Sequence, residues 1–151
     1  LEVRPIVRDE VLYVSASPER ARRPATIEQL VATPLVFYDA ESGDKDPIRR
    51  QLAERAQALG VRVQPKVEVE LKEIALRLVA AGLGDTYLPS AFIHAPYYPE
   101  GLSTAPFSPP LYDTFAIITR PGRRLSPGVR EVLSDLEAHM RAVADAFDRS
   151  R

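Results

Sequence analysis

The feature that most constrains the fold of this sequence is a change of apolar period in the middle of the chain. Valines at alternate positions predict a β-strand over Val61–Val69, in which Pro65 favours an edge position or a bend. Apolar residues then recur at helical spacing over Leu71–Val79 and stop at Gly82, a typical helix end. Another strand is predicted at Asp85–Leu88. Strand, helix and strand in direct succession are typical of an α/β fold.

The same alternation extends to both sides of this segment. The helices begin at recognisable caps, namely Thr26, Asp46-Pro47 and Ser126-Pro127, and the last helix is long with an apolar stripe that runs from Val129 to Phe147. A proline-rich stretch over residues 94–110 predicts an irregular connection. The order favours a mixed, mostly parallel sheet with helices on its faces. The further strands are predicted at Glu10–Ala16, Pro34–Ala40 and Leu111–Thr119.

Gly82 and Gly84 look at first like a phosphate-binding turn, but their position contradicts that function. A dinucleotide-binding turn follows a strand and opens a helix, so that the free N–H groups of the helix point at the phosphate. Here the glycines follow a helix and precede a strand, and no third glycine stands at the required spacing. We therefore predict that Gly82 ends the helix with a positive φ and that Gly84 forms a tight turn into the strand.

Composition excludes several classes of protein. The 151 residues are 45% apolar, which is enough for one domain, or two small lobes, with a buried core. The formal net charge of −1 provides no basic field for nucleic acid, so this chain alone is not expected to bind DNA. The sequence has no cysteine for a disulfide or a thiolate metal site, and no apolar run as long as a membrane span.

Catalysis and cofactor chemistry are not expected. The two histidines, His94 and His139, have no obvious carboxylate or serine partner, and metal-ligand spacings such as H-x-x-x-H are absent. The acidic residues are scattered, as on a solvated surface. We therefore predict neither an enzyme, nor a metal site, nor a cofactor.

Several segments together resemble the effector-binding domain of LysR-type transcriptional regulators. They are collinear with the family from about Arg4 to about Met140, which is more specific than any single motif. The sequence departs from the family's habits at Arg20–Pro24, and at Asp85-Thr86, where many members have apolar residues. The matching segments are RPIVRDEVLYVSASPE, PLVFYDAESGDKDPIRRQLAERAQALG, VQPKVEVE, LRLVAAGLGDTYLPSAF and PPLYDTFAIITRPGRRLSPGVREVLSDLEAHM.

The resemblance implies a type II periplasmic-binding-protein-like α/β fold, in which crossing strands join two lobes and a small metabolite binds between them. Residues 1–9 look like the first crossover segment, and residues 10–110 look like the second lobe. Residues 111–151 look like the return crossover strand and the C-terminal helix of the first lobe. The family's DNA-binding domain, linker helix and start of lobe one have no counterpart, and the chain begins without Met. We therefore expect an N-terminally truncated regulatory domain.

The resemblance also implies partners and a location. Members of the family couple a small-molecule effector to DNA through an N-terminal winged helix-turn-helix, and they assemble as homodimers or homotetramers in the cytoplasm. The helix over Leu71–Ala81 is expected to pack on a partner's first lobe, although its apolar stripe could equally face only its own sheet. For this chain we expect no membrane contact, and contact with DNA only through the missing N-terminal domain.

The loop after the strand Pro34–Ala40 is the best candidate for contact with an effector. Ligands bind beyond the carboxyl ends of strands in open α/β sheets, and a helix N-terminus attracts anions. Ser42 and Gly43 fall where family members often place polar effector contacts, although Ser42 could equally cap a turn. The acids of the loop would repel an anionic effector unless an arginine from lobe one compensates, so a neutral, cationic or metal-associated effector stays open. The predicted effector-binding residues are Tyr38, Asp39, Ser42, Gly43 and Asp44.

Two other functions stay open at this stage. A stand-alone or exported solute-binding protein would have the same architecture, and a signal peptide in the full-length sequence would favour it. A purely structural interaction module would bind no metabolite at all.

Overall fold

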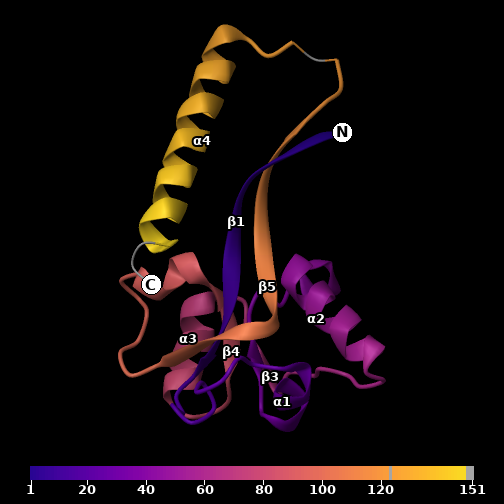
Figure 1. Ribbon diagram of the computed structural model, residues 1–151, viewed down its shortest axis with the longest axis vertical. Helices are drawn as coiled ribbons and strands as arrows, with labels where there is room; N and C mark the ends of the chain where they lie inside the picture. Colours follow the sequence, from indigo (N-terminus) through magenta and orange to yellow (C-terminus); the bar gives the residue numbers. More distant parts are fainter. Residues whose placement is uncertain (123, 149–151) are drawn as a thin grey trace. The chain divides into compact units, whose positions relative to one another are not determined.

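The computed structural model describes residues 1–122 and 124–148, with the side chains of all of these except residues 44 and 146–148. Strands and helices alternate along the chain, as the sequence predicts (Figure 1). Their bounds are β1 (Glu2–Ser15), α1 (Ile27–Ala32), β2 (Val36–Phe37), η1 (Gly43–Lys45), α2 (Pro47–Ala58), β3 (Val67–Glu68), α3 (Lys72–Ala80), β4 (Thr86–Pro89), η2 (Ser90–His94), β5 (Ser103–Thr119) and α4 (Pro127–Asp148), where η denotes a 3₁₀ helix.

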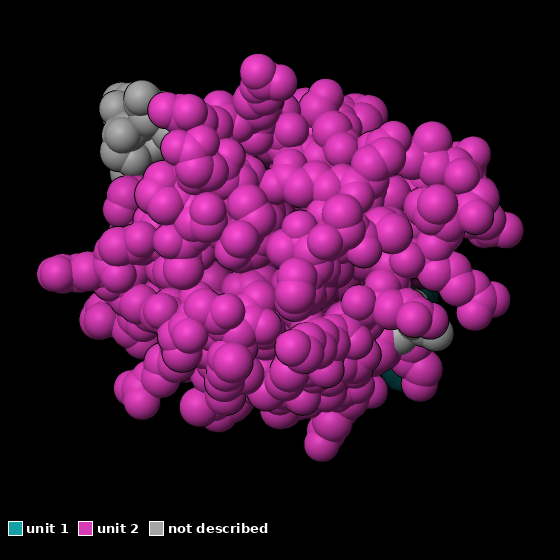
Figure 2. Space-filling model, turned by 90° about the horizontal axis from the view of Figure 1, so that it is seen from below, with its two compact units in different colours: residues 1–9, 113–151 teal, residues 10–112 magenta. Residues whose placement is uncertain are grey.

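The chain forms two compact units. Unit 1 comprises Leu1–Asp9 and Asp113–Arg151, and unit 2 comprises Glu10–Tyr112. One face of unit 2 is shown in magenta in Figure 2. The long strands β1 and β5 each contribute residues to both units. The assignment of these units to lobes of a larger domain stays a prediction.

Unit 2 is built on a mixed set of strand pairings. β4 pairs antiparallel with β1 over Val11–Val14, and β5 lies on the other side of β1. β2 and β3 pair in parallel, with Val36 opposite Val67, and a parallel bridge joins Leu35 to Asp85. Together with the helices, these pairings confirm the predicted α/β class with a mixed sheet.

The helices of unit 2 each bury one apolar face. This is the stripe that apolar spacing predicts for a helix packed on a core. Three tyrosines, Tyr13, Tyr38 and Tyr87, are also fully buried, and the rings of Tyr38 and Tyr87 lie 5.0 Å apart between centroids. The buried helical residues are Ile27 and Leu30 of α1, Ile48, Leu52 and Ala56 of α2, and Ala75, Leu76 and Val79 of α3.

Local signals fix the ends of these helices as predicted. The Thr26 side chain accepts a hydrogen bond from the Gln29 N–H at the start of α1. The Asp46 carboxylate accepts one from the Arg49 N–H, at 2.7 Å, at the start of α2. α3 ends just before Gly82, whose φ of +77° favours glycine.

Gly84 is required for a reason that the sequence does not reveal. A Cβ at this position would lie 2.7 Å from the Pro34 carbonyl oxygen and 3.2 Å from the side chain of Val36. The next residue, Asp85, donates its N–H to that same Pro34 oxygen at 2.8 Å. Glycine therefore lets the chain entering β4 approach β2 closely, which is a different role from the tight turn that we predict.

Two predicted strands are shorter in the structure. β3 retains only Val67–Glu68 of the predicted Val61–Val69, although side chains over residues 61–69 alternate between half-buried and exposed as expected. Of the preceding residues, Lys66 donates its N–H to the Leu35 carbonyl at 2.8 Å, but residues 61–66 are not assigned to a strand, and Pro65 has no N–H to donate. β2 retains only Val36–Phe37 because the chain turns away at Asp39.

The strand predicted at Leu111–Thr119 is longer in the structure. β5 begins at Ser103, inside the stretch that its prolines predict to be irregular. Ala25 anchors this part, since it donates its N–H to the Pro106 carbonyl at 2.8 Å and accepts from the Ser108 N–H at 2.9 Å. The prolines lie at exposed positions where these hydrogen bonds need no N–H, so they do not interrupt the strand.

Unit 1 consists of the outer parts of β1 and β5 with α4. Arg4 donates two hydrogen bonds to the carboxylate of Glu137 on α4, one of them at 2.7 Å. The helix forms as its apolar spacing predicts, but Val129, Val132 and Leu136 are 46%, 67% and 46% exposed. The side chain of Phe147, the last member of the predicted stripe, lies outside the described residues. The stripe is therefore largely exposed in this chain.

Candidate functional site

The five predicted effector-binding residues lie in the loop between β2 and α2. The loop leaves the buried end of β2 at Tyr38 and passes through η1. Asp39 has a φ of +53°, which is uncommon for a residue with a side chain. Its carbonyl oxygen accepts hydrogen bonds from the N–H groups of Ser42 and Gly43, at 3.1 and 3.3 Å. The loop is therefore a tight, hydrogen-bonded turn, and a strained backbone of this kind is frequent at ligand sites.

The Asp39 carboxylate forms an ion pair with Lys72, a residue that the sequence analysis did not single out. The Nζ–Oδ2 distance is 3.1 Å, and the side chains of Lys72 and Asp39 are 26% and 31% exposed. Asp39 follows β2 and Lys72 follows β3. Because these strands are parallel neighbours, their carboxyl ends meet at one edge of the sheet. The pair therefore stands where open α/β sheets bind ligands.

The ammonium group of Lys72 also lies over two aromatic rings. Its distance to the ring centroid is 4.7 Å for Tyr38 and 5.5 Å for Phe92. A cation–π contact contributes about 0.5–1 kcal/mol at an exposed site, and more where the cation is desolvated. The Tyr38 ring packs in turn against the ring of Tyr87, with 5.0 Å between centroids. Tyr87 is buried, and this burial raises the pKa of its hydroxyl. Lys72 is thus held in place while part of it stays accessible.

Ser42 and Gly43 form the outer part of the loop. Ser42 is exposed, and its side chain makes no capping hydrogen bond to η1. Gly43 has a φ of +47°, and no described atom lies within 4 Å of the position that a Cβ would take. A Cβ at Gly43 would therefore meet no described atom other than those of its chain neighbours. The backbone of Asp44 lies in η1, but its side chain lies outside the described residues, so its role stays a prediction.

Arg49, in the first turn of α2, fixes the strand end from which the loop begins. Its side chain is only 7% exposed. Nη2 donates to the carbonyl oxygen of Tyr38, Nη1 donates to the Glu68 carboxylate at 3.3 Å, and the guanidinium lies 5.1 Å from the centroid of the Phe37 ring. A buried charge is costly unless it is paired and hydrogen-bonded, so these contacts define one arrangement of the β2 end.

Positive charge offsets part of the acidity expected of this loop. Lys72 neutralises Asp39 from within unit 2, where the sequence suggested that an arginine from lobe one would be needed. The N–H of Glu41 donates to the carboxylate of Glu70 at 3.0 Å, which keeps a second acid close to the loop. Lys72 and Glu70 thus add one charge of each sign beside the loop, so repulsion of an anionic ligand is reduced only locally, where Lys72 neutralises Asp39.

The described residues contain no group of three His, Cys, Asp or Glu side chains that could hold a metal ion. None of their helices combines the length and apolarity needed to cross a membrane.

The sequence matches the model of one protein family over most of its length. That family is the LysR substrate binding domain, and the match covers residues 1–141. The chain belongs to this family. Members of the LysR family of domains are effector-sensing regulatory domains of transcriptional regulators. The comparison with curated proteins gives no match.

Solved LysR-type structures share the fold of this LysR domain. An OxyR mutant from Corynebacterium glutamicum gives a TM-score of 0.76 at 17% identity, over 99% of this chain and 46% of that one. The CcmR regulatory domain from Synechocystis, in complex with 2-PG, gives 0.69 at 17% identity, over 91% and 65%. The BenM effector binding domain with its effector benzoate gives 0.65 at 17% identity, over 92% and 64%. These structures confirm the type II periplasmic-binding-protein-like fold, and this chain spans about half to two thirds of their length.

Of the residues that contact the loop in this LysR domain, some could be predicted from the sequence and others could not. Lys72 opens a helix directly after a predicted strand, and in a mostly parallel sheet the rule that ligands bind beyond the carboxyl ends of strands extends to this position as well. Arg49 gives no such signal, because an arginine in the first turn of a polar helix is usually solvated. Phe92 follows β4 in η2, and its contact with Lys72 depends on packing between distant segments.

Proposed function

We propose that this chain is part of the effector-sensing domain of a LysR-type transcriptional regulator. Unit 2 would be the second lobe, and unit 1 would supply the crossover strands and the last helix of the first lobe. The family match over residues 1–141 supports a regulator, and the fold shared with the effector-bound BenM and CcmR domains supports a sensor. The parent protein would bind DNA in the cytoplasm through an N-terminal winged helix-turn-helix.

In this proposal the effector binds at the loop between β2 and α2. The observation that carries it is the partly exposed Lys72–Asp39 pair at the carboxyl edge of two parallel strands. In the same loop, Ser42 offers an exposed side chain, and among the described residues a Cβ at Gly43 would meet only its chain neighbours. The contacts assigned to the effector are Tyr38, Asp39, Ser42, Gly43 and Asp44, with Lys72 added.

The Lys72–Asp39 pair suits a binding site because it can open at low cost. Partly exposed ion pairs contribute about 0–1 kcal/mol, since both groups can return to water. A polar effector would replace Asp39 as a partner of Lys72 while the Tyr38 ring keeps the ammonium group in place. Binding would change the regulator only to the extent that the effector prefers one arrangement of the two lobes.

The full-length protein provides the direct test. It would be screened by thermal unfolding against carboxylates, amino acids and aromatic acids, because a ligand at 100 times its dissociation constant adds about 2.7 kcal/mol to the free energy of unfolding. Gly43→Ala should weaken binding of any ligand that stabilises the wild type. The matched control is Gly60→Ala, because Gly60 has a φ of +69° and equally open space around a Cβ.

Two results would contradict the proposal. One is the absence of stabilisation by any member of a broad library, which counts against a sensor of small molecules. The other is equal affinity in Gly43→Ala and Gly60→Ala for a ligand that does bind, which would leave a sensor but move its site away from this loop.

The proposal includes assembly into a homodimer or homotetramer through α3. This helix buries Ala75, Leu76 and Val79 on one side, while Leu71 and Ile74 on the other side are 57% and 42% exposed. The exposed apolar row supports the view that α3 faces a partner as well as its own sheet.

Sedimentation of full-length protein tests this surface. Ile74→Glu should shift the protein towards the monomer, because a carboxylate would be desolvated in the contact. Val31→Glu is the matched control, since Val31 on α1 is 44% exposed and outside the proposed contact. Equal sedimentation of both variants and the wild type would place the dimer contact elsewhere.

A further inference from the structure

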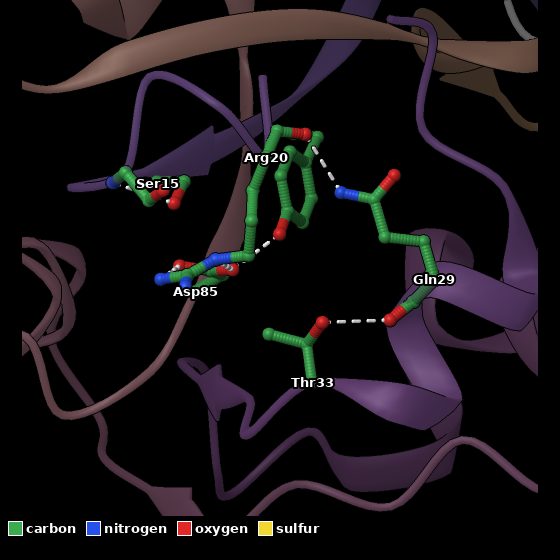
Figure 3. Close-up of polar contacts among 7 residues, drawn as sticks. Ser15, Arg20, Gln29, Thr33 and Asp85 are labelled. Atoms are coloured by element: carbon green, nitrogen blue, oxygen red, sulfur yellow. Dashed lines mark hydrogen bonds and ion pairs between the residues drawn. The ribbon is translucent and has the colours of Figure 1, made fainter. Parts of the chain in front are cut away.

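Asp85 holds a buried carboxylate in unit 2, away from the loop between β2 and α2. It is 0% exposed and accepts hydrogen bonds from Nε and Nη2 of Arg20, at 2.6 and 3.0 Å, and from the Tyr13 hydroxyl. Figure 3 shows the side chain of Arg20 reaching Asp85. Arg20 and Asp85 belong to the two segments in which the sequence departs from the family's habits, so the two departures form one ion pair.

This ion pair fixes the guanidinium of Arg20 in the wall of a hollow of about 500 Å³. Such a volume is within the range of small-molecule sites. The hydrogen bonds to Asp85 use Nε and Nη2, and Nη1 donates in none of the hydrogen bonds found among the described residues. Arg20 is 41% exposed, so it presents unused donors from a fixed position. The hollow is lined by Glu19, Arg20, Arg22, Arg23, Gln29, Ala32 and Thr33.

Two more arginines line the same hollow. Arg22 pairs with Glu19 at 3.0 Å, but these side chains are 73% and 72% exposed, so the pair contributes little and opens easily. Arg23 forms no hydrogen bond or ion pair with any other described residue. Another part of the lining is fixed in place, because the Gln29 side chain donates to the Arg20 carbonyl and the Thr33 hydroxyl donates to the Gln29 carbonyl, both at 2.8 Å (Figure 3).

The side chains at this hollow carry a net charge of +1, because three arginines are offset by only two carboxylates, those of Asp85 and Glu19. We propose that the hollow binds a phosphate group, either as inorganic phosphate or on a small phosphorylated metabolite. Arg20 is the fixed anchor, and Arg22 and Arg23 close on the bound group. Asp85 is a positioning residue that acts through Arg20.

The chemistry of arginine selects this class of ligand. A guanidinium donates two parallel hydrogen bonds to a phosphate, and a phosphate carries more charge and more acceptor oxygens than a carboxylate. A dianion replaces Glu19 as the partner of Arg22 at small cost, because that pair is exposed. It leaves the buried Arg20–Asp85 pair intact.

Isothermal titration calorimetry on the full-length protein tests the site, with inorganic phosphate, glycerol 3-phosphate and acetate as probes at constant ionic strength. We expect saturable binding of phosphate, no saturable binding of acetate, and at least a tenfold loss of phosphate affinity in the double variant Arg22→Gln, Arg23→Gln. Arg50→Gln is the matched control, because Arg50 is 64% exposed and lies on α2. Unchanged thermal unfolding of each unliganded variant shows that it is folded.

The outcomes separate the possibilities. Glycerol 3-phosphate binding more tightly than phosphate identifies a phosphorylated metabolite as the source, whereas equal affinities identify the phosphate group alone. Phosphate binding that is not saturable, or that is the same in the double variant and the control, overturns the proposal. The effector loop is not involved in this test, so its result is independent of the proposed sensor site.

Discussion

Two aspartates of unit 2 each pair with a basic side chain, and they differ in their surroundings. Asp85 is fully buried and accepts three hydrogen bonds from two residues, whereas Asp39 is 31% exposed and its carboxylate pairs, among the described residues, with Lys72. Removing a partner from a buried charge is costly, and opening an exposed pair is not. Of two pairs with similar chemistry, only the partly exposed Lys72–Asp39 pair can exchange its carboxylate partner for a ligand, whereas the buried Asp85 carboxylate keeps its partner and holds Arg20 in place.

The largest effect is expected from removing the partner of the buried carboxylate. Arg20→Met should lower the free energy of unfolding by about 3–5 kcal/mol, because Asp85 would lose its counter-charge inside the core. Urea denaturation measures this loss. Arg50→Met, at an exposed arginine, should stay within about 0.5 kcal/mol of the wild type. A loss below about 1 kcal/mol for Arg20→Met would show that Asp85 does not depend on its partner.

A smaller loss of stability is expected when Asp85 keeps its ion pair with Arg20 but loses the hydrogen bond from the Tyr13 hydroxyl. Tyr13→Phe should cost about 1–2 kcal/mol, since one hydrogen bond to a buried carboxylate disappears. The control is Tyr98→Phe, because the Tyr98 hydroxyl is buried with no hydrogen-bond partner among the described residues. Equal costs for the two substitutions would mean that the Tyr13–Asp85 hydrogen bond contributes no stability.

The same hydroxyl should make the buried pair sensitive to alkaline pH. Burial, and then the hydrogen bond to Asp85, raise the pKa of Tyr13 from 10.0 to about 12. Between these values the unfolded chain loses the phenolic proton and the folded chain keeps it, so stability is full below pH 10 and falls as pH rises towards 12. Tyr13→Phe should reduce this fall in chemical denaturation at a series of pH values. An unchanged pH profile in the variant would exclude Tyr13 as its source.

The smallest change in stability is expected at the partly exposed Lys72–Asp39 pair. Asp39→Asn should alter the free energy of unfolding by less than about 1 kcal/mol, and asparagine tolerates the positive φ of this position. Because the substitution frees Lys72, it should tighten the binding of an anionic effector in a thermal-shift titration. Glu54→Gln, which breaks an exposed pair with Arg50, serves as the control. A stability loss as large as that of Arg20→Met would remove the contrast between the two pairs.

Most of the architecture of unit 2 could be predicted because its signals are local. The caps at Thr26 and Asp46 and the helix end before Gly82 depend on residues within one turn of the chain. Strand lengths were less predictable, since they depend on pairing partners. The start of β5 at Ser103 is set by its contact with Ala25, and nothing in the proline-rich stretch indicates that contact.

The candidate site could be predicted only as far as one rule extends. The loop that contains Asp39 and Ser42 was identified from the rule that ligands bind beyond the carboxyl ends of strands in open α/β sheets. The rule was applied to one strand only, so Lys72, which follows the neighbouring strand, was not predicted. Arg20 and Asp85 were both recognised as unusual, yet they stand 65 positions apart in the sequence, so their contact was not predicted. A single sequence shows which residues are unusual but not which of them meet in the fold.

The Arg20–Asp85 pair also limits the order in which it can have arisen during evolution. An aspartate introduced first at position 85, before the arginine, would stand in the core as a negative charge without a counter-charge. An arginine introduced first would be tolerated, because the side chain of residue 20 is 41% exposed and reaches water. The tolerated order of substitution is therefore arginine at position 20 first and aspartate at position 85 second. Loss of the pair must begin with the replacement of Asp85. Relatives with arginine at position 20 and an apolar residue at position 85 should exist, whereas the opposite combination should be rare.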